Sequence, residues 1–575
     1  MPRSQRGWLP RSFLGDSERC RWFGSGVPSV MRVLLISAGR RTYFKWVSPP
    51  LGILQLAGYL RNRLTNLEFR VVDQRATDYT VEEVIARAVE FAPDVVGISC
   101  TTPNCNTLVA VSSGIRRALP QALLMIGGPH ASAFGAELMD TTCADCIVVG
   151  EGELTCEHVL RIWQEGSRDF SSVPGLVWRS AEGECLTNPG AAPVIQDLDT
   201  LPFPAYDLID LPSYWRLWSM SLLPPPRRYV SMFTSRGCPW KCIYCHDIFG
   251  KRFRAQSPER IVDELEHYVR TYGVKEVEFF DDIFNLHGRR VIEFSELMQR
   301  RNLRVSISFP NALRADILTP EVADALVAAG TREAALALET GSPRIQELIQ
   351  KRMNIPKFIE GVAMLAERRV FTYAFVMYGF PTETAADMQM TVDVVRRSKV
   401  HMVYSWIVTP YPKTELFDLA MRVHPERMAG IDLAGADYVQ NPCANLSEVS
   451  DETLKAFVYK IYPALYLNPL RVFRLVRDFP RPWAVWRYWR GVILALTYRG
   501  TAKPRRGTSS ATKGAGPAVA PGKLAADRLK QRKQQDGIEA AFSLSESGVS
   551  SVGSGLAGAE QSLGKPGQVD RNIER

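Results

Sequence analysis

The chain has 575 residues, of which 46% are hydrophobic, and this is enough for two or three folded domains. It carries 11 cysteines without a secretory signal pattern, which predicts a reducing, cytoplasmic setting and argues against a secreted disulfide scaffold. The formal net charge of +9 lies largely in the terminal segments, and we expect no nucleic-acid partner.

Both ends of the chain have the composition of unstructured segments. Residues 1–30 are basic and aperiodic, and we expect a disordered or non-native leader, with Met31 as the start of the native chain. Residues 501–575 are rich in Gly, Ala, Ser, Lys and Gln, which predicts a disordered tail.

Residues 31–160 predict a first domain with an open, parallel, Rossmann-like α/β sheet. Five short apolar runs alternate there with helix-length segments, as buried parallel strands do; they are 33–37, 69–73, 95–100, 122–127 and 146–150. Such sheets bind ligands at the carboxyl ends of their strands. Candidate binding residues at those ends are Ser37, Thr101, Gly127, Gly128, His130, Gly150, Glu151 and Gly152. For His130, stabilising its turn is the alternative to touching a ligand.

A linker at 161–228 is expected to contain a small hairpin and a Pro- and Asp-rich strip. Residues 229–414 then predict a partial (βα)6 TIM-like barrel. Its expected strands are 229–235, 276–281, 305–309, 334–339, 372–377 and 403–408. Barrel enzymes place reacting groups at the carboxyl ends of these strands. The polar and small residues found there are Asp281, Asp282, Glu339 and Gly379, and purely structural capping roles stay open for the carboxylates.

A triplet of cysteines follows the first barrel strand. Cys238, Cys242 and Cys245 form a Cys-x3-Cys-x2-Cys motif on one short loop. Clusters of the 4Fe–4S type take four thiolates, so a loop with three leaves one iron open to a substrate or cofactor. His246 follows directly, and we expect it beside the cluster or at the surface, not as a ligand.

The triplet, with Tyr244 before its last cysteine, resembles the signature of the radical SAM superfamily. The helix expected at 49–61, the GGPHAS turn and the GEGE segment resemble the cobalamin-binding domain that precedes the barrel in one subclass. The resemblance implies three cofactors: a 4Fe–4S cluster, S-adenosylmethionine (SAM) and cobalamin. It assigns SAM to Tyr244, Asp281, Asp282, Glu339 and Gly379, and cobalamin to the residues at the ends of the first sheet. Arg75 stands where the family's cobalt-binding histidine would be, so we expect cobalamin without a histidine ligand.

The activity that the resemblance implies is radical C-methylation of an unactivated carbon in a small-molecule or lipid-like substrate. A flavodoxin or ferredoxin would donate the electron. No catalytic residue is identified beyond the cofactor ligands. An oxidative cyclase or rearrangement enzyme, similar to the anaerobic magnesium-protoporphyrin ester cyclase, is the alternative, and a non-catalytic cobalamin or redox sensor is a third.

The segment 415–500 is expected to be helical, aromatic and rich in Arg. One interpretation is a set of helices that closes the open barrel. The other is a peripheral membrane contact through residues 465–500, with Trp and Arg at headgroup depth.

Overall fold

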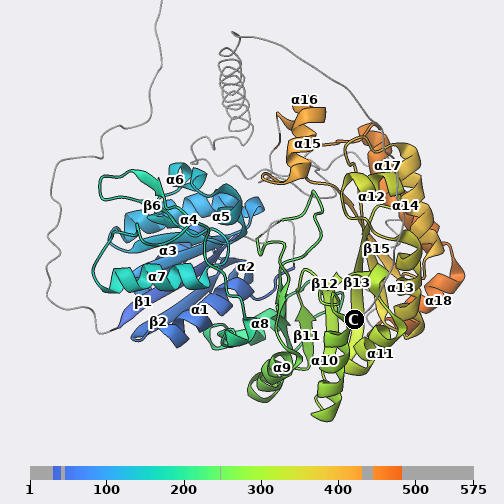
Figure 1. The fold of residues 1–575 in the computed structure, drawn as a ribbon, viewed down its shortest axis with the longest axis horizontal. Coiled ribbons are helices and arrows are strands. Elements are labelled where there is room, and N and C mark those ends of the chain that lie inside the picture. The colour runs from blue at the N-terminus through green and yellow to red at the C-terminus, as the bar shows by residue number, and fades with distance from the viewer. Residues whose placement is uncertain (1–29, 40–45, 247, 430, 432–443, 482–575) are drawn as a thin grey trace, which may run out of the picture. The chain divides into compact units, whose positions relative to one another are not determined.

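The computed structural model describes residues 30–39, 46–246, 248–429, 431 and 444–481. The expected leader, apart from residue 30, the segment 482–500 and the expected tail at 501–575 lie outside these residues. The described part contains a seven-stranded sheet and a six-stranded sheet, which confirms the predicted α/β class with two parallel sheets (Figure 1).

The first sheet has the strand order β2-β1-β3-β4-β5-β6-β7. Its strands are β1 (Met31–Ala38), β2 (Leu67–Asp73), β3 (Val95–Cys100), β4 (Leu123–Gly127), β5 (Cys146–Ile147), β6 (Val177–Arg179) and β7 (Cys185–Thr187). Strands β1 to β5 pair in parallel, whereas β6 pairs antiparallel with β5 and with β7. The hairpin expected in the linker therefore extends this sheet past residue 160.

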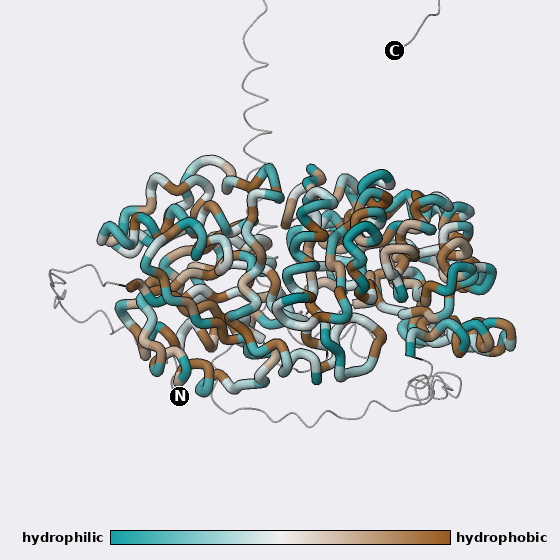
Figure 2. Tube along the Cα trace, turned by 90° about the horizontal axis from the view of Figure 1, so that it is seen from below, coloured by the Kyte–Doolittle hydropathy of each residue, from teal (hydrophilic) through white to brown (hydrophobic). Residues whose placement is uncertain are grey.

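Helices cover both faces of the first sheet. They are α1 (Leu51–Arg63), α2 (Gln74–Thr77), α3 (Val81–Phe91), α4 (Cys105–Ala118), α5 (Gly128–Phe134), α6 (Glu137–Thr141) and α7 (Glu153–Gln164). Alternate residues of β1 face opposite sides: Leu35 lies in a core with α1 and α7, and Leu34 in a core with α3 and α4. The strands are therefore buried on both faces, and their apolar stretches run through the middle of this domain (Figure 2).

The second sheet has the order β15-β14-β13-β12-β11-β8, and every neighbouring pair is parallel. Its strands are β8 (Tyr229–Met232), β11 (Glu276–Phe279), β12 (Ser306–Leu313), β13 (Thr331–Glu339), β14 (Phe371–Tyr378) and β15 (Met402–Ile407). The helices between them are α9 (Pro258–Tyr272), α10 (Gly288–Arg300), α11 (Pro320–Ala329), α12 (Pro343–Leu348), α13 (Ile355–Glu367) and α14 (Ala385–Arg397). Because β8 and β15 are the two edges of this sheet, the barrel is open along one seam.

Local sequence signals explain where these helices begin and end. Helix α9 starts after Ser257, whose side chain accepts a hydrogen bond from the Arg260 amide, and Pro258 occupies its first turn. The helix ends at Gly273, which has a positive φ of 65° and donates its amide to Val269. This pattern of a polar cap, proline and final glycine recurs in α11.

The seam of the barrel is covered by residues from outside the sheet. The ring of Trp46, in the connection after β1, meets Tyr404 of β15 edge-on at 6.4 Å. The carbonyl of its neighbour Val47 lies 3.3 Å from the Tyr229 hydroxyl of β8. Trp46 also forms a parallel bridge with Trp218, after the short helix α8 (Leu211–Trp215). The connection after β1 thus bridges both edge strands.

Four helices follow the barrel in the described chain: α15 (Glu415–Val423), α16 (Pro425–Met428), α17 (Asp451–Tyr466) and α18 (Pro469–Asp478). Helix α17 buries Leu454, Val458 and Ile461 in the barrel core. No helix in the described residues is long and apolar enough to cross a bilayer. An apolar row, called the α18 row below, is exposed: Leu467, Leu470, Phe473 and Val476, at 76, 74, 63 and 37%.

Candidate functional site

The cysteine loop leaves the barrel after β8 and returns through a two-stranded sheet. Strand β9 (Ser235–Arg236) pairs antiparallel with β10 (Arg254–Ala255), so the chain between them forms one closed excursion. Gly237 starts it with a φ of +84°, and a Cβ atom there would lie 2.4 Å from the Arg252 carbonyl. This turn requires glycine, which explains the Arg-Gly-Cys sequence.

The loop is fastened to the rest of the barrel at Ile243, between its second and third cysteines. The Ile243 amide donates to the Ile349 carbonyl at 3.1 Å, and the Ile243 carbonyl accepts from the Leu416 amide at 2.9 Å. Its side chain is 5% exposed in a core shared with Phe380. These contacts set the spacing of the cysteines on either side.

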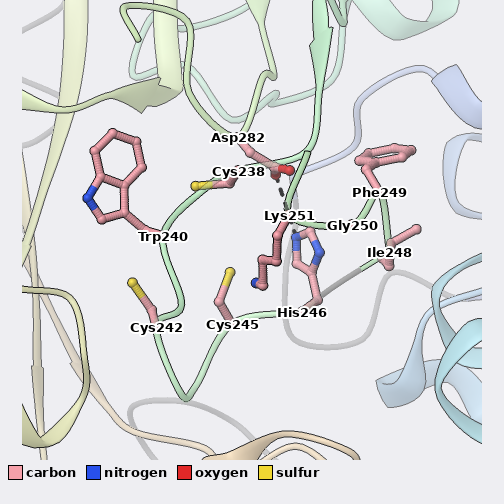
Figure 3. Close-up of a pocket in the computed structure, with 10 residues that line it drawn as sticks. All are labelled: Cys238, Trp240, Cys242, Cys245, His246, Ile248, Phe249, Gly250, Lys251 and Asp282. Carbon is pink, nitrogen blue, oxygen red and sulfur yellow. Dashed lines mark ion pairs between the residues drawn. The ribbon is translucent and has the colours of Figure 1, made fainter. Parts of the chain in front are cut away.

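The three cysteines line one cavity, together with Trp240, His246 and Asp282 (Figure 3). Within the described residues, no three His, Cys, Asp or Glu side chains are placed to hold a single metal ion. A loop with three cysteines can supply one thiolate to each of three irons of a cluster. Burial raises the pKa of the Cys238 thiol, and burial followed by Asp282 raises that of Cys245 to about 12. The thiolates therefore need a positive partner at this site, which a metal cluster supplies.

The two adjacent carboxylates after β11 have different surroundings. Asp281 is fully buried, and its Oδ1 atom accepts hydrogen bonds from the Thr234 amide at 3.0 Å, the Thr234 hydroxyl at 2.9 Å and the Ser235 hydroxyl. Asp282 lines the cysteine cavity, and its Oδ1 lies 3.7 Å from Nε2 of His246 (Figure 3). Asp281 thus orders the base of the loop, whereas Asp282 faces the reactive space.

Glu339 lies beside Tyr244 and Lys351. It ends β13 with a φ of +66°, which is uncommon for a residue with a side chain and turns the carboxylate at the strand end. Its Oε1 is 3.2 Å from the Tyr244 hydroxyl and 3.0 Å from Nζ of Lys351. The sequence analysis did not single out Lys351, which lies three residues after the end of α12.

Gly379, after β14, has a φ of +92° and donates its amide to Glu383 at 2.6 Å. The Phe380 amide donates to the same carboxylate oxygen at 3.1 Å. Burial raises the pKa of Glu383 to about 8. The Gly379 amide is thus already bonded within its own turn, and what this residue offers a ligand is its small size.

The carboxyl ends of the first sheet are aligned by register. Ser37 of β1 pairs with Asp73 of β2 and with Ser99 of β3, and Ser99 pairs with Gly127 of β4. Thr101 follows β3 and is exposed, and its hydroxyl accepts a hydrogen bond from the Asn104 side chain at 3.0 Å.

Glycines keep this edge of the first sheet open to a large ligand. Gly128 has a φ of +85°, and a Cβ atom there would lie 2.4 Å from the Ser99 hydroxyl. Gly150 has a φ of +77° with open space where a Cβ would be, so a ligand can approach its backbone. Such an edge fits a large cofactor like cobalamin.

His130 and Arg75 lie at the same end of this sheet. His130 is 5% exposed, with Nδ1 3.3 Å from the Thr102 hydroxyl and its ring 4.5 Å from that of Phe134. Burial lowers its pKa to about 4, so the ring is neutral. These contacts are those of a turn-stabilising residue. Arg75 follows β2 and donates to the Trp46 carbonyl at 2.7 Å.

The GEGE turn after β5 is joined to the cysteine loop by buried ion pairs. Arg236 donates to Glu151 and to Glu153, each at 2.6 Å, and Arg254 also binds Glu151. All four side chains are at most 9% exposed. We call these residues the buried Arg–Glu network. It occupies the carboxylate of Glu151, so Gly150 and Gly152 are left to offer their backbone to a ligand.

Sequence reasoning missed this network because its partners are 83 to 103 residues apart and follow no local pattern. The position of Arg236 directly before the Gly-Cys pair was the available signal. The structure thus brings the cysteines together with Asp282, and Glu339 together with Tyr244, while Asp281 and Glu151 serve the framework.

Comparisons with known proteins agree with this geometry. The family model "B12 binding domain" matches residues 41–160, and "Radical SAM superfamily" matches residues 232–395. An uncharacterized methyltransferase from Pyrococcus horikoshii is 29% identical over 454 residues, which cover 76% of this chain and 93% of the relative. An anaerobic magnesium-protoporphyrin IX monomethyl ester cyclase from Rubrivivax gelatinosus is 27% identical over 398 residues, covering 67% and 69%.

Among solved structures, the radical S-adenosylmethionine methyltransferase TsrM from Kitasatospora setae, with cobalamin and a 4Fe–4S cluster bound, has a similar fold. The TM-score is 0.61 at 17% identity, and the match covers 81% of this chain and 98% of that one. At this identity the likeness concerns the fold. The two family models and the cysteine cavity assign the chemistry: the chain combines a cobalamin-binding domain with a radical SAM domain, and its cofactors are a 4Fe–4S cluster, SAM and cobalamin.

Proposed function

We propose that this enzyme transfers a methyl group to an unactivated carbon of a small-molecule substrate. The bound cofactors supply reductive cleavage of SAM, hydrogen abstraction from the substrate and delivery of the methyl group. The protein's own part is to hold these groups next to one another, to orient the substrate and to exclude water.

The buried Arg–Glu network is the observation that carries this proposal. It links the turn after β5, at the ligand edge of the first sheet, to the residue two positions before Cys238. Neither end can shift without leaving a charge unpaired in the interior, which costs several kcal/mol. The network thus fixes the proposed cobalamin edge relative to the cysteine loop. Such an arrangement suits a reaction in which one substrate lies between the two cofactor sites.

The side chains near the cysteine cavity take distinct roles in this proposal. Cys238, Cys242 and Cys245 bind three irons of the cluster. The Asp282 carboxylate meets the ammonium group of SAM, because it is the charged acceptor that lines the same cavity. Glu339 accepts hydrogen bonds from SAM hydroxyl or amino groups.

Two further residues hold Glu339 in place. Lys351 and Tyr244 both reach its Oε1, and Lys351 compensates its charge. Tyr244 also closes one side of the SAM site, and Gly379 leaves room for the adenine.

Cobalamin is assigned to the edge formed by Ser37, Thr101, Gly127, Gly128, Gly150 and Gly152. Arg75 stays protonated and cannot bind cobalt, and His130 is engaged inside its own turn. We therefore propose that no histidine of this edge binds the metal.

Three partners complete the proposal. The substrate is a small molecule, the electron donor is a flavodoxin or ferredoxin, and the α18 row contacts an anionic lipid surface. Arg474 and Arg477 alternate with this row, and the following sequence WAVWRYWR adds Trp and Arg without an acidic residue. Apolar side chains beside arginines are the pattern of an interfacial helix.

The test is an anaerobic assay of the reconstituted enzyme with a reductant, SAM carrying a deuterated methyl group, and fractionated metabolites. Methyl transfer predicts 5′-deoxyadenosine, S-adenosylhomocysteine and a product that carries the deuterated methyl group. An oxidised or rearranged product without the label would instead support the cyclase alternative. A Cys238→Ala variant should form none of these, and a wild type that forms no 5′-deoxyadenosine would refute the proposal.

A further inference from the structure

A second cavity, of about 110 Å³, lies inside the barrel, separate from the cysteine cavity. Six aromatic side chains line it: Trp46, Trp218, Tyr373, Phe375, Tyr404 and Trp406. In the β14–β15 pairing, Phe375 lies opposite Tyr404, so alternate residues of both strands share this face. The intervening residue Ala374 is fully buried, and strand alternation places it on the opposite face of the sheet.

The aromatic rings form a box around this cavity. Those of Tyr404 and Trp406 are nearly parallel, with centroids 5.9 Å apart and an angle of 14°. Trp46 meets Tyr404 edge-on from the seam. Tyr404, Trp406 and Phe375 stay partly exposed although they point into the barrel. Aromatic side chains that line a cavity form a surface on which a flat apolar ligand can pack.

One polar group at this cavity lacks a partner. The Tyr373 side chain is 1% exposed, and its hydroxyl makes no hydrogen bond of good geometry within the described part of the chain. The neighbouring Glu333 carboxyl accepts from the Ser221 hydroxyl and the Leu222 amide, each at 2.8 Å. A buried hydroxyl without a partner is uncommon in folded proteins, and an oxygen of a ligand would satisfy it.

The size and position of the cavity narrow the ligand further. Apolar cavities of roughly 150 Å³ bind benzene, so this one holds about one ring. Trp406 lies one residue before the end of β15, and Tyr373 lies five residues before the end of β14. At about 3.3 Å per residue, Tyr373 is roughly 17 Å below the strand ends, where the cysteine loop lies. A ligand anchored at Tyr373 would therefore extend toward the reactive rim.

We propose that this cavity binds the substrate through a flat apolar ring whose hydroxyl or carbonyl oxygen pairs with Tyr373. This inference rests on the proposed function, because it takes the occupant to be the methyl acceptor. Trp46 belongs to the connection that follows β1, whose carboxyl end lies at the proposed cobalamin edge. A ligand ring packed against Trp46 would therefore lie where the first sheet meets the barrel.

Phenol and toluene are suitable probes, because they differ mainly in one hydroxyl. Equilibrium dialysis of the labelled compounds against the full-length reconstituted enzyme should show saturable binding, with phenol bound more tightly. The Tyr373→Phe variant should weaken phenol by about fivefold, the effect of one hydrogen bond, and leave toluene unchanged. The Trp406→Leu variant should weaken both about two- to tenfold.

Tyr378→Phe is the matched control. Tyr378 lies on the same strand with a buried, unpartnered hydroxyl, but its ring faces Phe457 of α17, away from the cavity. This variant should bind both probes like the wild type. Absence of saturable binding, or equal phenol binding by wild type and Tyr373→Phe, would overturn the proposal.

Cobalamin provides the remaining arm of the test. If cobalamin displaces phenol competitively, the box holds the corrin and the substrate proposal fails; unchanged phenol binding supports it. The two proposals fail in different assays. If the methyl-transfer proposal is wrong, the activity assay gives 5′-deoxyadenosine without a labelled product. If the substrate-cavity proposal is wrong, the phenol-binding measurements show it, whatever the activity assay gives.

Discussion

Replacing Glu151 by glutamine removes a charge that two buried arginines share. Glu151 accepts from Arg236 at 2.6 Å and from Arg254 through both of its oxygens. Its side chain is 2% exposed, and those of the arginines are 9% and 5% exposed. Water therefore cannot take over the missing acceptor.

The expected cost follows from these contacts. Removing one partner of a buried ion pair costs about 3–5 kcal/mol. Arg236 also pairs with Glu153, at 2.6 Å, and the substitution leaves this partner in place. We therefore expect a loss of stability at the lower end of that range, about 3 kcal/mol. This is a large share of the roughly 5–15 kcal/mol by which domains are stable, and the loss should concentrate in the β9–β10 hairpin that carries Cys238.

Two measurements check the Glu151→Gln prediction: iron bound per chain after anaerobic reconstitution, and the thermal unfolding midpoint. Both should fall. Glu293→Gln is the matched control, since Glu293 pairs with Arg289 at 2.8 Å on the surface, where such pairs contribute about 0–1 kcal/mol. If the two variants retain the same iron and unfold at the same temperature, the network does not position the loop.

Three further substitutions address the cluster ligands, a buried carboxyl and the α18 row. Cys242→Ser should abolish iron binding and 5′-deoxyadenosine formation, because only two of the three thiolates remain. Glu383 has a pKa of about 8 in the folded protein and an ordinary, lower one when unfolded, so stability should fall as pH rises from about 5 to 8, by up to ~1.4 kcal/mol per pH unit. Glu383→Gln should remove that slope in thermal unfolding. Phe473→Glu should weaken co-sedimentation with phosphatidylglycerol vesicles about tenfold or more.

Each of these has a control. Cys143→Ser changes an exposed free cysteine outside the loop and should leave iron content unchanged. Glu360→Gln changes an exposed carboxylate and should keep the wild-type pH slope. Val423→Glu changes an exposed apolar residue on α15, away from the α18 row. Equal iron in Cys242→Ser, an unchanged slope in Glu383→Gln, or no vesicle binding by the wild type would each contradict its prediction.

The strands could be predicted closely because they are continuous apolar runs. The strand expected at 372–377 is found as Phe371–Tyr378. The first barrel strand was drawn too long: β8 ends at Met232, and residues 235–236 leave the barrel sheet to pair with β10. Periodicity describes which face a residue occupies, and it does not show which neighbour a strand end pairs with.

The candidate site was predicted in part. The cysteines and Asp282 follow strand ends, and topology brings those ends together. The pairing of Lys351 with Glu339 depends on where α12 stops, and helix boundaries are the least certain part of a periodic pattern. The buried Arg–Glu network depends on contacts between two domains, for which one sequence carries no periodic signal.

The covered seam of the barrel has a consequence for recombining such enzymes. Trp46 and Val47 belong to the amino-terminal domain by sequence, yet they contact the two edge strands of the barrel. A barrel excised at residue 229 would expose the Tyr229 and Tyr404 faces to solvent. A working chimera would therefore have to exchange these seam residues together with the barrel. The segment that must be exchanged as a whole is larger than the barrel domain alone.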